Sequence, residues 1–144
     1  MTRRGCRVPI ERRKAVEILV VEGSSEKVYF DSLVRLGDTD VAVRTVNCHG
    51  GDIKSVRHVC ESMMEAGGRM QGDFIGVVID VDNTTKDEML GFIRWCEERK
   101  IEVYISNPSF EVFLLMHYTD VPSSISQHDM EDSLGRLQGR KYDK

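Results

Sequence analysis

Two short apolar segments constrain the fold of this chain more than any other feature. Residues 18–21 read Ile-Leu-Val-Val and stop at Glu22, and residues 77–79 read Val-Val-Ile and stop at Asp80. Continuous β-branched segments of this length are typical of strands that are buried on both faces of a parallel sheet. Because helices cover both faces of such sheets, the two segments predict an α/β protein whose strands end at carboxylates.

The rest of the chain alternates between strand and helix patterns. Strands are expected at residues 17–21, 41–46, 73–79 and 101–105. Segments with apolar residues at helical spacing separate them, and a weaker helix is expected at residues 129–137. This alternation implies parallel pairing through right-handed crossovers. The expected fold is therefore a three-layer α/β sandwich with a central, mostly parallel four-stranded sheet flanked by helices.

Several helix starts carry capping signals. Residues 85–88, Thr-Lys-Asp-Glu, match the capping-box pattern. Gly50-Gly51 before Asp52 fits either a turn with Asp52 as the N-cap, which we favour, or a phosphate cradle. Asn107-Pro108 predicts a further helix, with Asn as the N-cap and Pro in the first position. The apolar sequence of residues 110–116 predicts that this helix is largely buried.

Length and composition indicate one ordinary globular domain. The chain has 144 residues, 40% apolar and 31% charged. Residues 1–14 are strongly basic and fit either an arm that contacts phosphates or a solvated leader, and residues 15–144 are expected to form a single domain. The net charge of −4 argues against coating nucleic acid by bulk charge, although a local basic patch is compatible with it.

The sequence also bears on the compartment. No segment approaches the length of a membrane span, and the basic start lacks the apolar core of a signal peptide. The four cysteines are far apart and show no Cys-x-x-Cys spacing, so we expect reduced thiols and no zinc site. These observations predict a cytoplasmic protein.

The carboxylates at the strand ends predict the active site. In open α/β sheets, sites lie beyond the carboxyl ends of the strands, so Glu22, Asp80 and Asp82 are expected at one edge. Side chains two apart on a strand point to the same face, which lets Asp80 and Asp82 share one ion. Clustered carboxylates favour Mg²⁺ or Mn²⁺. The alternative is that Asp80 and Asp82 only end a strand and cap a helix.

Other polar residues are candidates for the same site. Glu111 stands in an apolar helical segment, where a buried acid needs a cation or hydrogen-bond donors. We interpret it as a further ligand or an orienting residue, with bracing of the Asn107-Pro108 turn as the alternative. Glu26 is expected to be structural, in a first helical turn. His117 is expected to be a core histidine. It lies about 240° around the helix from Glu111, too far round to share an ion easily.

Lysines near the end of the chain allow two interpretations. Lys141 and Lys144 are able to neutralise a phosphate charge, but solvated tail residues are the default interpretation.

These residues resemble known families. Glu22-Gly23 and the later Asp80-Val81-Asp82 resemble the Toprim domain, the metal-binding fold of topoisomerases, primases and related nucleases. The chain is more closely similar to the RloB-like family of prokaryotic defence-island proteins, over roughly residues 10–144. The most specific similarity is Ser-Asn-Pro-Ser-Phe-Glu at residues 106–111, running to His117. The family resemblance extends to the basic start, to the segment from Val21 to Phe30 and to the final Gly, Lys and Tyr residues. Family members usually continue further, so this chain is either naturally short or a fragment.

The resemblance implies a Toprim-like sandwich and a metal-dependent phosphodiester hydrolase, or nuclease, of phage or plasmid defence. Glu22, Asp80 and Asp82 would be both Mg (or Mn) ligands and catalytic residues, with Glu111 as a further catalytic residue. The resemblance assigns Glu22 to metal binding or to acid–base work, and we expect it to share both through water. DNA or RNA is the expected substrate, with partner proteins of a defence system and no membrane.

Two other functions remain open on the sequence. The first is a non-catalytic metal- or nucleotide-binding signalling module that acts with partner proteins. The second is a receiver-like or phosphatase-like domain with a phosphorylated aspartate, which leaves residues 107–111 unexplained. The sequence does not determine the substrate, the oligomeric state or whether this polypeptide is catalytically complete.

Overall fold

The computed structural model describes residues 16–37, 42–49, 52–65, 73–81 and 84–142. The basic segment at residues 1–14, the Gly50-Gly51 pair, Asp82 and Lys144 lie outside the described residues. In chain order the elements are β1 (Val16–Val21), α1 (Ser24–Leu36), β2 (Ala42–Asn47), α2 (Ile53–Glu65), β3 (Phe74–Asp80), α3 (Lys86–Glu98), β4 (Glu102–Ser106), α4 (Glu111–Met116) and α5 (Gln127–Gln138).

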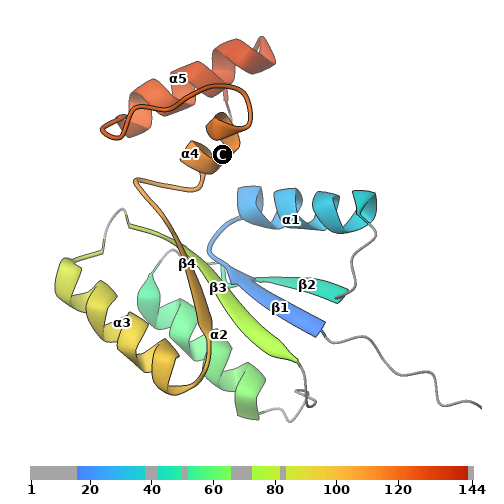
Figure 1. Ribbon diagram of the computed structural model, residues 1–144, viewed down its shortest axis with the longest axis vertical. Coiled ribbons are helices and arrows are strands. Elements are labelled where there is room, and N and C mark those ends of the chain that lie inside the picture. The colour runs from blue at the N-terminus through green and yellow to red at the C-terminus, as the bar shows by residue number, and fades with distance from the viewer. Residues whose placement is uncertain (1–15, 38–41, 50–51, 66–72, 82–83, 143–144) are drawn as a thin grey trace, which may run out of the picture.

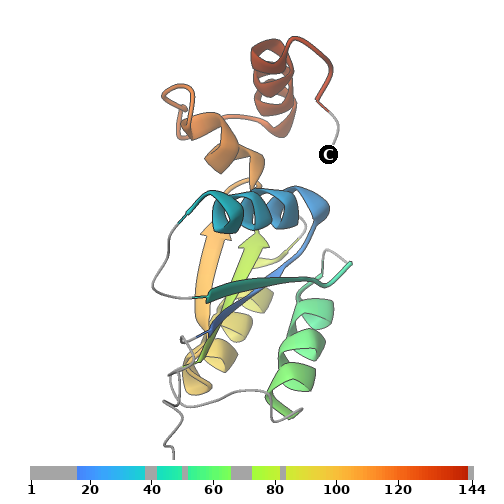
Figure 2. The ribbon, with the colours of Figure 1, turned by 90° about the vertical axis from the view of Figure 1, so that its right-hand side faces the viewer.

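The described strands form one sheet in the order β2-β1-β3-β4, and all three neighbouring pairs are parallel (Figure 1). The predicted α/β sandwich with a parallel four-stranded sheet is confirmed. Helices α2 and α3 cover one face, α1 lies on the other, and α4 and α5 stand beyond the end of the sheet where β3 and β4 finish (Figures 1 and 2). Each strand lies within one or two residues of its predicted position.

The strands distribute their apolar side chains between two cores. Val20, Val77 and Ile79 pack with α2 and α3 in the larger cluster, which includes the stacked rings of Phe92 and Trp95. The alternate residues point the other way, and Val21 and Val78 pack in a second cluster beside α1. This division explains why the strands are apolar on both faces, as their sequences indicate.

Capping begins two of the helices as expected. The Thr85 hydroxyl accepts from the Glu88 amide, and the Glu88 carboxylate accepts from the Thr85 amide, which completes the predicted capping box of α3. Asp52 accepts from the amide of Ser55 at 2.7 Å, which is the contact of an N-cap residue.

The start of α4 differs from its prediction. Asn107 and Pro108 form a bend rather than a helical turn, and α4 begins at Glu111. The Asn-Pro pair directly follows Ser106, the last residue of β4, and the residue that precedes α4 at its N-cap is Phe110, so the pair follows the strand instead of starting the helix. The prediction of a largely buried helix is also wrong in part, because Met116 is 62% exposed while Leu115 is buried. The short helix α4 presents one side to α5 and leaves another uncovered.

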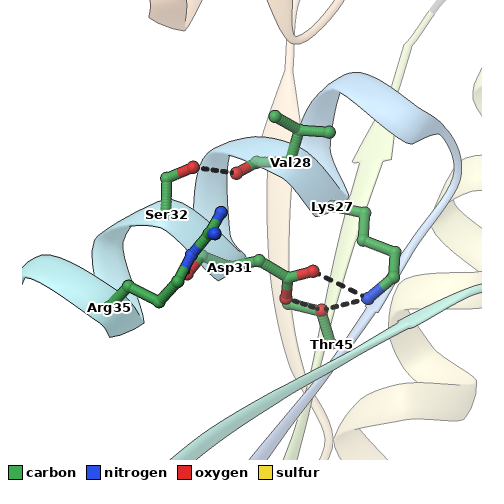
Figure 3. A network of polar contacts seen from close by, with 6 residues as sticks. All are labelled: Lys27, Val28, Asp31, Ser32, Arg35 and Thr45. Carbon is green, nitrogen blue, oxygen red and sulfur yellow. Dashed lines mark hydrogen bonds and ion pairs between the residues drawn. The ribbon is translucent and has the colours of Figure 1, made fainter.

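A polar network joins α1 to the edge strand β2 (Figure 3). The Lys27 ammonium donates to the Asp31 carboxylate at 2.9 Å and to the Thr45 hydroxyl at 3.0 Å. The Thr45 hydroxyl in turn donates to Asp31. These hydrogen bonds, that of Thr45 first and then that of Lys27, lower the pKa of Asp31 below its ordinary value of 3.8.

The lowered pKa of Asp31 predicts an acid-dependent contribution to stability. A carboxyl whose folded pKa is depressed stabilises the protein above its unfolded pKa, and the contribution is lost as the pH falls through the folded pKa. We expect Asp31→Asn to unfold at lower urea concentration than the wild type at pH 7, and the difference to shrink toward pH 3. Asp120→Asn, at an exposed loop position, is the matched control. A difference that is constant with pH would contradict the assignment.

Replacing glycine by alanine is expected to change the unfolding free energy in opposite directions at Gly76 and at Gly91. A Cβ at Gly76 would stand 2.9 Å from Leu19 Cδ2 and 3.0 Å from the Tyr104 ring, whereas a Cβ at Gly91 in α3 meets nothing within 4 Å. Leu19 is 6% exposed and packs in the second cluster, so its methyl group would have to leave its packed position. Gly76→Ala should therefore cost about 1–3 kcal/mol of unfolding free energy by overpacking. Gly91→Ala should gain about 0.5–1 kcal/mol in a helix interior. Chemical denaturation measures both, and equal effects would refute the packing argument.

Candidate carboxylate site at the sheet edge

The strands that carry two of the predicted site residues are neighbours. Glu22 follows β1 directly, and Asp80 is the last residue of β3. Strands β1 and β3 pair in parallel with Val21 opposite Val78, so both carboxylates come at the same edge of the sheet. Asp80 alternates in phase with Val78, which places it on the α1 face.

Glu111 comes to the same edge through packing. Phe110 belongs to the cluster that contains Val21 and Val78. Glu22, Asp80 and Glu111 thus each follow a member of one apolar cluster by one or two residues. Their exposed fractions are 5% for Asp80 and 0% for Glu111, while Glu22 is half-buried. Three of the four predicted site residues are thus carried by backbone next to members of one apolar cluster.

Two hydroxyl groups contact the Glu111 carboxylate. The fully buried hydroxyl of Ser109 lies 2.6 Å from Glu111 Oε2 and 2.8 Å from Gln127 Oε1 of α5. The Tyr142 hydroxyl donates to the other carboxylate oxygen, Oε1, at 3.4 Å. Buried acids are costly unless such donors meet them, so Glu111 is held by hydrogen bonds as its position in an apolar segment predicted.

Glu26 is a further carboxylate in this region. It lies in the first turn of α1 and is only 3% exposed. A Cβ at Gly23 would stand 2.9 Å from Glu26 Oε2, so the carboxylate folds back over the glycine that follows Glu22. Gly23 therefore leaves room for a second acid beside the strand end. Sequence reasoning assigned Glu26 a structural role; the only signal of its burial was its spacing of four residues from Glu22.

The predicted metal site is described only in part. Asp82, the third predicted ligand, lies outside the described residues. Among the residues that are described, no group of three or more His, Cys, Asp or Glu side chains is arranged to hold a metal ion. The three-ligand site of Glu22, Asp80 and Asp82 therefore stays a prediction.

His117 is not a core histidine, contrary to the prediction. Its side chain is exposed at the end of α4, and Nε2 lies 3.0 Å from the Tyr29 hydroxyl of α1. The ring also lies edge-on to Phe113, with 5.0 Å between centroids. The helix ends at the surface, so its last residues pack on α1 from outside rather than within the core. His117 joins α4 to α1.

Two cavities lie on opposite faces of the sheet. One of about 570 Å³ lies on the α1 face and is lined mainly by apolar side chains of α1, β4 and α4, with Glu17, Ser106 and Asn107 as its polar lining residues. The other, of about 440 Å³, opens between the starts of α2 and α3 and is lined in part by Lys54, Arg57 and Thr84. None of Glu22, Asp80 and Glu111 lines either cavity.

Two of the described cysteines, Cys60 and Cys96, have buried thiols. Cys48, Cys60 and Cys96 form no disulfide. Burial raises the pKa of Cys60 to about 12 and that of Cys96 to about 11. Both thiols stay protonated at neutral pH and act as small apolar core residues.

The described helices were also compared with the length and hydropathy that a membrane span requires. None of them is both long enough and apolar enough to cross a bilayer.

Comparison with known protein families identifies the family of this chain. A family model described as RloB-like protein matches residues 18–144. The chain belongs to the RloB-like protein family. The matched range of this RloB-like chain includes Glu22, Asp80, Asp82 and Glu111, as well as Tyr142 near its end. Comparison with curated proteins finds no match, and comparison with solved structures finds none either.

The Ser109 contact predicts a measurable loss of stability. Ser109→Ala removes one buried donor from the Glu111 carboxylate, which should cost about 1–3 kcal/mol of unfolding free energy. Ser123→Ala, at an exposed position before α5, should change the unfolding free energy by less than about 0.5 kcal/mol. Urea denaturation at pH 7 compares the two variants. Equal stability of both would show that Ser109 does not hold Glu111.

Proposed function

We propose that this RloB-like protein is a metal-dependent phosphodiester hydrolase, a nuclease of the Toprim type that acts in phage or plasmid defence. The observation that carries the proposal is the convergence of Glu22, Asp80 and Glu111 on one apolar cluster at the carboxyl edge of a parallel sheet. Sites of open α/β sheets lie at this edge. The part played in defence rests on the family resemblance.

The chemistry of the donor set suits Mg²⁺ or Mn²⁺. Glu22 and Asp80 supply carboxylate oxygens from neighbouring strand ends, and Asp82 follows Asp80 after one residue. Hard divalent cations prefer such oxygen ligands. A cation held there supplies positive charge that polarises the phosphoryl group and makes a water more acidic.

Side chains of the protein would bind the cation, orient the reacting groups and accept a proton. Glu22 and Asp80 would bind and orient the cation, together with Asp82. Glu111 would orient the reacting groups or accept a proton, because Ser109 and Tyr142 hold its carboxylate in place. The apolar cluster beneath excludes water from one side, which strengthens electrostatic interactions at the site. Phosphoryl transfer needs chiefly positioning and charge stabilisation, which these groups provide.

A basic side chain outside the carboxylate edge offers a contact for a nucleic-acid phosphate. Lys54 and Arg57 line the cavity between the starts of α2 and α3, and Arg57 also pairs with Glu61 of its own helix. The acids in the same cavity are engaged, since Asp52 accepts from the Ser55 amide and Glu88 from Thr85. Lys54 would therefore contact a phosphate backbone bound there.

A second candidate is a nucleotide-binding signalling module that cuts nothing. The cavity of about 570 Å³ favours it, because small-molecule sites commonly measure about 300–1,000 Å³. Phe30, Tyr104 and Phe110 line this cavity, and aromatic rings stack on nucleobases. Ser106 and Asn107 would supply polar contacts at one end.

Metal-dependent stability and cleavage test the proposal together. Mg²⁺ or Mn²⁺ at about a hundredfold excess over its Kd should raise the Tm of the wild type by roughly 5–10 °C. Asp80→Asn should abolish this shift. It should also reduce cleavage of plasmid DNA or of RNA by more than the roughly 10–100-fold typical of changes in residues around the ligands. Calorimetry and gel assays measure the two effects.

The controls separate the two candidate functions. Asp120→Asn makes the same chemical change in an exposed loop and should leave both readouts unchanged. Stabilisation by metal or by a nucleotide without cleavage would favour the signalling module. If the metal has no effect on the wild type, both the metal site and the nuclease proposal are wrong.

A further inference from the structure

The chain turns back on itself after α5. Gly139 ends the helix in the left-handed conformation, with φ of 68°. The Arg140 amide then donates to the Gly135 carbonyl at 3.1 Å. This is the geometry of a helix C-cap that reverses the chain direction. The three residues that follow Gly139 therefore run back along α5 instead of away from it.

Gly135 makes this return possible. A Cβ at Gly135 would lie 3.0 Å from the Arg140 carbonyl oxygen and 3.3 Å from the Tyr142 amide nitrogen. Both are backbone atoms, which cannot move aside as the end of a flexible side chain can. The returning chain thus packs against α5 more closely than a Cβ usually allows, so an alanine at this position would require the returning backbone to shift by a few tenths of an ångström.

The return places Tyr142 between two elements of the carboxylate site. Its ring packs against Leu115, Met130 and Leu134, which form the core between α4 and α5. Its hydroxyl lies 3.4 Å from Ser25 Oγ at the start of α1 and 3.4 Å from Glu111 Oε1. Figure 2 shows the end of the chain descending from α5 toward the start of α1.

We propose that Tyr142 is a positioning residue that holds Glu111 at the carboxylate edge. Because the tyrosine proton goes to Glu111, Ser25 donates to the tyrosine oxygen, and a chain of two hydrogen bonds runs from α1 to α4. Ser25 stands three residues after Glu22, so the chain links the strand end that carries Glu22 to the helix that carries Glu111. The catalytic consequence rests on the proposed function, whereas the positioning itself does not.

The packing of α4 fixes its backbone, and hydrogen bonds fix the Glu111 carboxylate. Phe113 and Leu114 of α4 pack toward α1 and the second cluster, and Leu115 packs against α5. The Glu111 carboxylate must nevertheless keep a fixed place relative to Glu22 and Asp80, since misplacement of a reacting group by about 1 Å can cost a hundredfold in rate. The Tyr142 bridge, with His117 and Tyr29 at the other end of the helix, sets that place.

Tyr142→Phe tests the positioning, because it keeps the packed ring and removes only the hydroxyl. We expect backbone amides of residues 111–116 in the metal-free protein to exchange about five- to tenfold faster, as loss of one such hydrogen bond implies. Tyr118→Phe is the matched control, since Tyr118 is 69% exposed. Exchange at the wild-type rate in Tyr142→Phe would overturn the proposal.

A second variant displaces the Tyr142 hydroxyl by moving the backbone that carries it. Gly135→Ala should push the returning chain away from α5 and reproduce the faster exchange at α4. Gly91→Ala, a helix glycine with open space around it, should not. Faster exchange in Tyr142→Phe but not in Gly135→Ala would overturn the part of the proposal that makes the close return necessary.

Kinetics separate this proposal from the proposed function. If the wild type cleaves nucleic acid, Tyr142→Phe should lower kcat about 10–100-fold with little change in KM, while Tyr118→Phe keeps both. An unchanged kcat per folded molecule would overturn the catalytic consequence. A wild type that cuts nothing would overturn the nuclease proposal alone, and the exchange comparison would still decide the role of Tyr142.

Discussion

The apolar cluster of Leu19, Val21, Val78 and Phe110 is the constraint on which the rest of the site depends. Three of its members come from the central strands β1 and β3, and one comes from the turn before α4. Each carboxylate of the site follows one of them closely in the chain, so packing of the cluster sets the position of the backbone that carries each carboxylate. Buried apolar contacts tolerate little displacement because interiors are close-packed. A site assembled on such a base is therefore preorganised before any cation or substrate binds.

Helices cover the two faces of the sheet unequally. Helices α2 and α3 close one face over a continuous core. The other face carries α1 near β2, while α4 and α5 stand beyond the sheet (Figure 1). A cavity of about 570 Å³ lies beside β4 on this face. The closed face supplies most of the packing, and the open face carries Asp80.

Buried polar groups at the site oppose stability. Glu26, Asp80 and Glu111 are nearly inaccessible, and burial of a carboxylate is costly even when hydrogen bonds compensate it. Hydrogen bonds from Ser109 and Tyr142 offset part of the free-energy cost of burying the Glu111 carboxylate. A protein selected for stability alone would place apolar residues there. Their concentration at one sheet edge supports a functional site.

Much of this protein was determined by its sequence alone. Residues 18–21 and 77–79 were recognisable as buried strands because β-branched runs suit a parallel sheet, and the capping box at Thr85 was readable because it is local. The burial of Glu111 followed from its apolar neighbours. Local patterns failed at Asn107-Pro108, where a proline signal fits both a helix start and the end of a strand, and at His117, whose exposure depends on what covers α4.

Only the tertiary structure decided the contacts between distant segments. Tyr142 and Ser25 are 117 residues apart, and the pattern around either gives no sign of the other. Glu26 is buried because its helix starts beside Gly23 at the end of a central strand, which its own turn does not reveal. Periodicity reports which face of an element is apolar; which elements meet across space is decided when those faces pack together.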